Sequence, residues 1–254
     1  MNNDLAAARE KERVEQGITE GWNDRKNILV ILAHPDDPEY FCGGSIARWA
    51  QAGHNVSYCL FTRGEKGVQD ILEDPVVLAN QRENEQRNAA KILGVDAVRF
   101  LDFEDGGLQP TMEARKAIVR IIREEKPDIL VTSDPTNYFP RENRINHPDH
   151  RIAGQIVTEA VFPASGNPLY FPDLLKAGYE PHLVKELWLT LTTQGNVDLD
   201  VTEWWEQRIN ALKMHHSQVP DADTLEENQR SRRSANSTLE NPRYIEKFRR
   251  IKFK

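Results

Sequence analysis

The stretch ILVILAHPDD, residues 28–37, places a run of apolar side chains directly before a histidine, a proline and two aspartates. An unbroken apolar run of this length predicts a strand that is buried on both faces of a parallel sheet. Ionisable side chains that follow such a strand lie at the carboxyl edge of the sheet, where ligands bind in open α/β folds. A second cluster, NHPDH at residues 146–150, indicates that the two clusters meet at one site.

Strand-like and helix-like segments alternate between residues 27 and 162, which predicts an α/β fold with a mostly parallel sheet. The predicted strands are 27–33, 56–60, 98–103, 128–132 and 183–193, and the predicted helices are 43–53, a segment ending at Gly94, 113–125, a segment that follows 147–149, and 201–214. Residues 34–41 are expected to form the first strand-to-helix loop. We therefore predict a Rossmann-like three-layer sandwich with its candidate metal site at the carboxyl ends of the strands.

We expect a single domain over residues 1–254, with a core at about 27–218, a charged helical extension at 1–25 and a polar, basic segment at 219–254. Residues 162–178 are rich in Pro and Gly and are candidates to wall the pocket, and the loop 66–75 is a candidate to fold over it. Residues 221–241 are polar, which favours a mobile segment. Near the C-terminus, Tyr244, Phe248 and Ile251 recur at helical spacing and predict an amphipathic helix.

The composition narrows the class of partner. The chain carries 33 Lys and Arg against 40 Asp and Glu, so its net charge of −7 argues against wholesale binding to nucleic acid or to an acidic membrane. The two cysteines cannot build a disulfide framework and no signal-peptide pattern opens the sequence, so we expect a cytoplasmic protein. No apolar run approaches the roughly 20 residues that a transmembrane helix needs. A small molecule is the expected partner.

His34 and Asp37 stand three residues apart in a loop that Pro35 restrains, so both side chains can face one point. A catalytic zinc site typically combines about three N or O ligands with one position for water, so a third ligand must come from elsewhere. His147 or His150 can supply it, because their spacing places both on one face of a helix. A metal-dependent hydrolase is the leading interpretation, in which Asp36, beside Asp37, accepts the proton of the activated water.

Several motifs occur in a distinctive order: AHPDD after a buried strand, TRGEKG after the next, an Arg-x-x-Glu helix, LDFEDGGL, NHPDHR and finally KMHHSQ. This series resembles the PIG-L/LmbE-like zinc-dependent N-deacetylase family over about residues 27–218. The resemblance implies a hydrolase that removes an N-acetyl (N-acyl) group from an amino sugar such as N-acetylglucosamine, or from its conjugate. It also implies Zn²⁺ as the cofactor, although N and O ligands accept Fe²⁺ and other divalent metals.

The resemblance also implies roles for individual residues. His34, Asp37 and His150 match the family's metal ligands, and Asp36 matches its general base. His147 matches a histidine that stabilises the oxyanion or protonates the leaving amine. The two aspartates could instead have a purely structural role, as a helix cap in a solvated turn, but the second complete cluster argues against this alternative.

Substrate contacts are implied for Arg82, Asp105 and His215. Arg82 has the alternative of pairing with a neighbouring glutamate on an exposed helix, and Asp105 has that of a turn residue before two glycines. The sequence leaves open whether His215 or His216 faces the site. One departure from the family pattern is visible, because Pro38 intervenes between the two aspartates and the glutamate that usually follows them directly. It bears on the shape of the loop.

Other functions remain open at this point. An amidase acting on thiol-sugar conjugates is a close relative of the first interpretation, and a non-catalytic sugar-binding protein could share the fold. Two histidines and one carboxylate also form the facial triad of non-haem iron oxygenases, but the strand–helix alternation argues against the jelly roll that such an enzyme would need. Association into a homo-oligomer is a further expectation that rests on the family resemblance.

Overall fold

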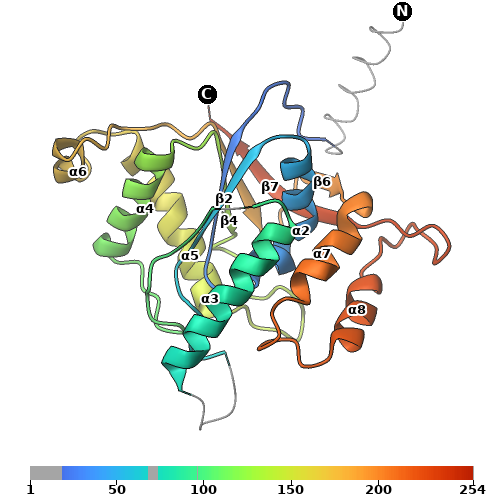
Figure 1. Ribbon diagram of the computed structural model, residues 1–254. Helices are drawn as coiled ribbons and strands as arrows, with labels where there is room; N and C mark the ends of the chain where they lie inside the picture. Colours follow the sequence, from blue (N-terminus) through green and yellow to red (C-terminus); the bar gives the residue numbers. More distant parts are fainter. Residues whose placement is uncertain (1–18, 68–73, 96, 254) are drawn as a thin grey trace, which may run out of the picture.

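Seven strands form one sheet in the part of the chain that the computed structural model describes, residues 19–67, 74–95 and 97–253 (Figure 1). Their order across the sheet is β3-β2-β1-β4-β5-β7-β6. The strands are β1 (Asn27–Leu32), β2 (Asn55–Leu60), β3 (Ala97–Phe100), β4 (Ile129–Ser133), β5 (Glu186–Thr190), β6 (Val197–Asp200) and β7 (Ile245–Lys252). The first five in this order pair parallel, whereas β7 is antiparallel to both β5 and β6. The predicted α/β fold with a mostly parallel sheet is confirmed.

Helices cover both faces of the sheet. The main helices are α2 (Asp37–Gln51), α3 (Pro75–Ile92), α4 (Met112–Glu125), α5 (Pro148–Glu159), α6 (Pro172–Lys176), α7 (Trp205–Leu212) and α8 (Ala222–Arg230). Helices α4 and α5 lie on one face, and α2, α3 and α7 lie on the other (Figure 1). The three layers of the predicted sandwich are therefore present.

The side chains of β1 alternate between two hydrophobic clusters. Ile28, Val30 and Leu32 pack into the cluster beneath α2, α3 and α7, while Leu29, Ile31 and Ala33 pack into the cluster beneath α4 and α5. Since both faces of this strand are buried, its sequence is continuously apolar instead of alternating. The order of strands reverses at β1, with β2 on one side and β4 on the other, and this is the point where open α/β sheets bind ligands.

The first strand-to-helix loop is shorter than predicted. Residues 34–41 were expected to form it, but α2 already begins at Asp37, with Pro38 in its first turn. The expected start at the glycine pair 43–44 reflects a break in this helix, where Cys42 has non-helical backbone angles. There the Glu246 carboxylate accepts hydrogen bonds from the N–H groups of Gly44 and Ser45, as a capping side chain does at a helix start.

The predicted amphipathic helix near the C-terminus is wrong, because these residues form β7. Tyr244, Glu246 and Phe248 are buried at alternate positions, as a strand requires. The four-residue spacing of Tyr244 and Phe248 fits a helix and a strand equally well. Ile251 lies on the opposite face, partly buried in the cluster beneath α4 and α5.

Other parts of the outer chain also differ from the predictions. Residues 221–241, expected to be mobile, contain helix α8. The segment 162–178 forms part of a π-helical turn and α6 and supplies none of the residues that line the large cavity described below, so it does not wall the pocket. Most of the predicted extension 1–25 and the centre of the loop 66–75 lie outside the described residues. Among the described helices, none has the length and apolar character to cross a membrane.

Candidate metal and catalytic site

A cavity of about 1230 Å³ opens at the carboxyl ends of the central strands and receives both ionisable clusters. The cavity is lined by most of the site residues that the sequence predicts: His34, Asp36, Asp37, Arg82, Asp105, His147 and His150. The first cluster follows β1 and the second begins α5, so the sheet brings together side chains more than 100 positions apart, as the 115-residue separation of His34 and Asp149 shows. His215 is not among the lining residues.

The three predicted metal ligands lie together, with His34 and His150 both beside the Asp37 carboxylate. His34 Nδ1 lies 3.5 Å from Asp37 Oδ2, and His150 Nε2 lies 3.0 Å from Asp37 Oδ1. The backbone N–H of His34 also donates to Asp37 Oδ2 at 2.9 Å, which fixes the carboxylate. Burial raises the pKa of the Asp37 carboxyl, but the two histidines outweigh it and hold this pKa well below its ordinary value. The carboxylate is therefore ionised and available as a ligand.

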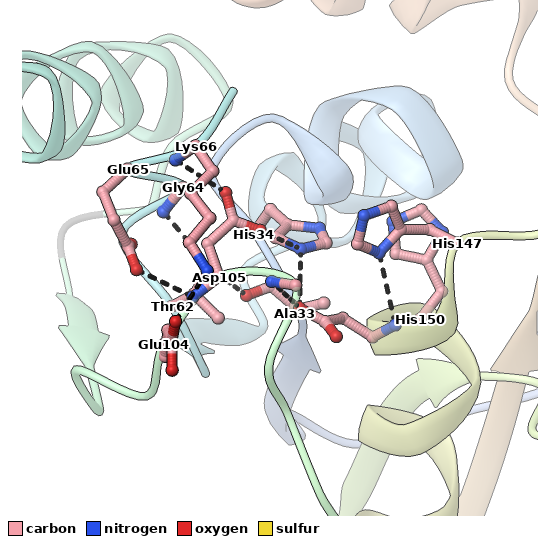
Figure 2. A network of polar contacts seen from close by, with 12 residues as sticks. Ala33, His34, Thr62, Gly64, Glu65, Lys66, Glu104, Asp105, His147 and His150 are labelled. Atoms are coloured by element: carbon pink, nitrogen blue, oxygen red, sulfur yellow. Dashed lines mark hydrogen bonds and ion pairs between the residues drawn. The ribbon is translucent and has the colours of Figure 1, made fainter. Parts of the chain in front are cut away.

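The outward nitrogens of both histidines have hydrogen-bond partners. His34 Nε2 lies 3.2 Å from Asp105 Oδ1 and 3.3 Å from Asp149 Oδ2, and His150 Nδ1 lies 3.0 Å from Asn146 Oδ1. Figure 2 shows His34 between Asp105 on one side and His147 and His150 on the other. An acceptor behind each ring fixes the tautomer that leaves the inward nitrogen free to bind a cation.

The surroundings of His34 are strongly anionic. Burial lowers the pKa of His34, while hydrogen bonds to Asp105, Asp149 and Asp37 raise it well above its ordinary value. Burial raises the pKa of Asp105, yet the His34 hydrogen bond and charge bring it down to about 2. Three carboxylates around one imidazole favour a positive charge at this position, whether a proton or a metal supplies it. The donor set fits a divalent metal.

Among the described residues, two groups of donors have ligand atoms that all lie within 4.8 Å of one another: His34 with His147 and His150, and His34 with Asp105 and Asp149. In the second group, a backbone N–H donates to one oxygen of each carboxylate. Lys66 N–H donates to Asp105 Oδ2 at 3.0 Å, and Gly106 N–H donates to Asp149 Oδ2 at 2.7 Å. Both carboxylates also lie beside His34 Nε2 and can orient its ring, while Asp149 Oδ1 is buried without a hydrogen-bond partner among the described residues. Asp149 was missed from the sequence, although it stands between the two histidines of NHPDH.

Asp36 sits beside this cluster in a left-handed backbone conformation, with φ of 86°. Its N–H donates to Gln86 Oε1 at 2.8 Å, and Arg82 Nη2 lies 3.5 Å from its Oδ2. Burial raises the pKa of the Asp36 carboxyl to about 6, and the charge of Arg82 opposes that rise. Asp36 therefore has the pKa of a carboxylate that can accept a proton near neutral pH.

Arg82 fixes the loops on both sides of Asp36. Its guanidinium donates to the carbonyl oxygens of Gly64 and Pro35, each at 2.8 Å. Gly64 has a φ of +69°, and a Cβ there would lie 2.2 Å from the Arg82 guanidinium, so only glycine lets the arginine pass. The alternative of an exposed surface pair does not apply to Arg82, because only 4% of its surface is exposed.

His147 occupies the N-cap position of α5, where its Nδ1 accepts a hydrogen bond from the Asp149 N–H at 3.2 Å. Its ring meets that of His34 edge-on, with centroids 4.7 Å apart. Burial lowers the pKa of His147, and the charges of His34 and His150 lower it further. The neutral ring, with Nδ1 as the acceptor, carries its proton on Nε2.

His215 is the inward-facing member of its pair, but it lies behind the cavity wall. Its side chain is completely buried, and its Nε2 lies 3.2 Å from Glu39 Oε2, whereas His216 is exposed. Gln86 Nε2 donates to both Glu39 oxygens, at 3.0 and 3.1 Å. The structure thus gives His215 a contact with Glu39, and its substrate contact stays a prediction. No pattern in the sequence marks Gln86 as part of the site.

A family model described as PIG-L, GlcNAc-PI de-N-acetylase, matches residues 29–161. The chain is 38% identical over 204 residues to diacetylchitobiose deacetylase from Thermococcus kodakarensis, an alignment that covers 80% of this chain and 74% of the relative. The solved structure of N,N'-diacetylchitobiose deacetylase from Pyrococcus horikoshii superposes with a TM-score of 0.82 and 29% identity, covering 99% of this chain and 93% of that chain. The 4-carboxy-2-hydroxymuconate hydratase GalB of Pseudomonas putida shares the fold, with a TM-score of 0.70 at 20% identity over 90% of this chain and 97% of that chain.

Proposed function

The chain belongs to the PIG-L family of GlcNAc-PI de-N-acetylases, and we propose from this that it is a hydrolase that removes the N-acetyl group of an amino sugar or its conjugate. The observation that carries the proposal is the convergence of His34, Asp36, Asp37, His147 and His150 in one cavity. The T. kodakarensis and P. horikoshii relatives are named as deacetylases of an N-acetylated disaccharide, which supports this class of substrate. The likeness to GalB shows only that the fold also serves another protein.

In this proposal His34, Asp37 and His150 hold one divalent metal, with zinc as the first candidate. A metal bound there would polarise the amide carbonyl and lower the pKa of a water molecule to about 7. Asp105, Asp149 and Asn146 orient the two histidines from behind.

The side chains of the protein carry the protons. Asp36 takes a proton from water as the water oxygen bonds to the acyl carbon, and Arg82 keeps this carboxylate in place. His147, through its Nε2–H, donates to the acyl oxygen or supplies the proton of the leaving amine. The carbon–nitrogen bond then breaks, and acetate and a free amine are released.

Acetate release from N-acetylglucosamine and diacetylchitobiose, measured before and after chelation and zinc restoration, tests the function. Chelation should abolish release, and zinc should restore it. Asp36→Asn should lower kcat by about 100-fold or more, the range for loss of a general base, with metal content unchanged. His150→Ala should lower metal content itself, whereas Asp173→Asn, on exposed α6, should change neither quantity.

Retention of activity within tenfold by Asp36→Asn would contradict the role of that residue. Metal binding without acetate release from any N-acetylated sugar would favour the non-catalytic binding protein, and dependence on oxygen would favour the iron oxygenase. Release from a thiol-sugar conjugate alone would identify the related amidase. The cytoplasmic location, the single domain and the homo-oligomer stay predictions.

A further inference from the structure

Three arginines, Arg141, Arg144 and Arg232, line the catalytic cavity where it opens to solvent. None of the three takes part in an ion pair or a side-chain hydrogen bond among residues 19–67, 74–95 and 97–253. The other arginines of the cavity differ in this respect. Arg82 binds two carbonyl groups, and Arg208 binds the Gln229 side chain and the Tyr40 carbonyl.

The backbone brings two of these charges together. Arg141 and Arg144 face each other across an isolated antiparallel bridge that closes a tight turn. Residues paired in this way carry their side chains on the same side, where like charges repel and cost stability. Both residues line the cavity, so the turn places this pair of like charges at its opening.

Arg232 approaches from a distant segment, just after α8. It lines the same cavity as Arg141 and Arg144. Partial burial lowers the pKa of Arg232, Tyr40 opposes this shift, and the positive charges of Arg141 and Arg144 lower the pKa further. The facing groups from other elements do not neutralise them. Tyr40 on α2 contributes a phenol, Glu246 on β7 is engaged by Gly44 and Ser45, and Lys247 adds a further positive charge.

We propose that Arg141, Arg144 and Arg232 form a subsite for an anionic group, a carboxylate or a phosphate, on the substrate whose N-acetyl group lies against His34 and Asp36. This inference rests on the proposed function and names the class of conjugate that the site takes. Guanidinium groups match the geometry of both anions through paired hydrogen bonds. A positive cluster without an ion-pair partner among the described residues is unexpected on a chain whose net charge is −7, and a negatively charged ligand would compensate it.

Three substrates that share one reacting group test the subsite. The neutral probe is the methyl glycoside of N-acetylglucosamine, the carboxylate probe is its carboxymethyl glycoside, and the phosphate probe is N-acetylglucosamine 1-phosphate. At least one anionic probe should exceed the neutral one in kcat/KM by about tenfold, a difference of about 1.4 kcal/mol. The ratio should fall as salt is added, because the arginines are exposed to solvent. Which anionic probe is preferred distinguishes a carboxylate from a phosphate ligand.

The variants Arg232→Gln and Arg141→Gln/Arg144→Gln should bring the ratio of anionic to neutral kcat/KM toward one. The matched control Arg120→Gln removes the same charge from the exposed side of α4, outside the cavity, and should leave the ratio unchanged. A ratio near one in the unaltered protein, or an equal fall in all variants, would overturn the subsite.

Binding separates failure of the subsite from failure of the proposed function. Calorimetric titration of the Asp36→Asn protein with both anionic probes measures binding without turnover. Adding Arg232→Gln to this variant should raise the Kd about tenfold. Binding that depends on Arg232 without turnover by the unaltered protein would keep the subsite and reject the deacetylase. Turnover of the neutral probe with anion binding indifferent to Arg232 would keep the deacetylase and reject the subsite.

Discussion

Gln86→Met tests whether the buried amide behind the catalytic cavity holds Asp36 in place. Gln86 is completely buried, its Oε1 accepts the Asp36 N–H, and its Nε2 donates to the Glu39 carboxylate. Methionine has a similar length and volume but replaces these groups with a thioether. The substitution therefore removes hydrogen bonds with little change in packing.

The size of the effect follows from the two groups left without this partner. The Asp36 N–H would lose its hydrogen bond and the Glu39 carboxylate would lose the donor that both its oxygens share, and a buried group left unsatisfied costs about 1–3 kcal/mol. Glu39 keeps its contact with His215, so we expect the free energy of unfolding to fall by about 3 kcal/mol. For a chain of this size the fall corresponds to a drop in Tm of roughly 6–12 °C.

Activity should fall as well, because Asp36 has a left-handed backbone that only a few contacts hold. A displacement of the proton acceptor by about 1 Å can lower kcat by about 100-fold. Urea denaturation, kcat and metal content measured on the same preparation separate the two effects. The expected result is lower stability and lower kcat with one metal still bound.

Gln81→Met on the same helix is the control, since Gln81 is exposed and its only side-chain hydrogen bond among the described residues is with Glu85. It should change stability by less than about 0.5 kcal/mol. Unfolding of Gln86→Met within that same margin, or an unchanged kcat, would refute the role assigned to the amide.

Two further substitutions test the fold. Glu186→Gln removes the negative charge and one of the two oxygens that accept from Arg250 on β7, and should destabilise the protein by about 3 kcal/mol in urea denaturation. Lys185→Gln, at an exposed pair, should cost less than about 1 kcal/mol. Burial raises the pKa of Glu186, but Arg250 and Trp188 outweigh it and hold this pKa below its ordinary value of 4.5. The stabilisation by Glu186 is therefore fully present above about pH 4.5 and is lost as the pH falls through the folded-state pKa. If the stability of Glu186→Gln falls with decreasing pH in the same way as that of the unaltered protein, this reasoning is contradicted. Gly154→Ala should lower Tm although alanine favours helices by about 1 kcal/mol, because its Cβ would lie 2.2 Å from the Ser133 carbonyl oxygen. Gly195→Ala, whose Cβ meets only ordinary contacts, is its control.

The sequence predicts the central strands and the residues that follow them better than it predicts the contacts between distant parts of the chain. The apolar run of β1 has one satisfactory environment, a strand covered on both faces, and the ionisable residues after it must then lie at the sheet edge. That reasoning brings His34 and His150 together before any coordinates are considered. It depends on local pattern and on the general topology of parallel sheets.

The remaining features depend on partners that are distant in sequence. Glu39 meets Gln86 at a separation of 47 residues and His215 at a separation of 176, and no local pattern marks either contact. The two histidines of NHPDH account for that motif by themselves, so nothing in the sequence marks a separate role for Asp149. The spacing of Tyr244 and Phe248 fits two structures, and pairing with β5 and β6 decides between them.

The position of β7 inside the sheet determines which strands are left at its edges. The two edge strands of the described sheet, β3 and β6, have only four residues each, and both carry charged side chains, Arg99 on β3 and Asp198 and Asp200 on β6. Short, charged edges offer little unpaired backbone to a strand from another molecule. Loss of residues 245–252 would instead uncover β5, all five of whose residues are buried. That strand would then be a template for aggregation, so an intact β7 protects the solubility of the protein as well as its fold.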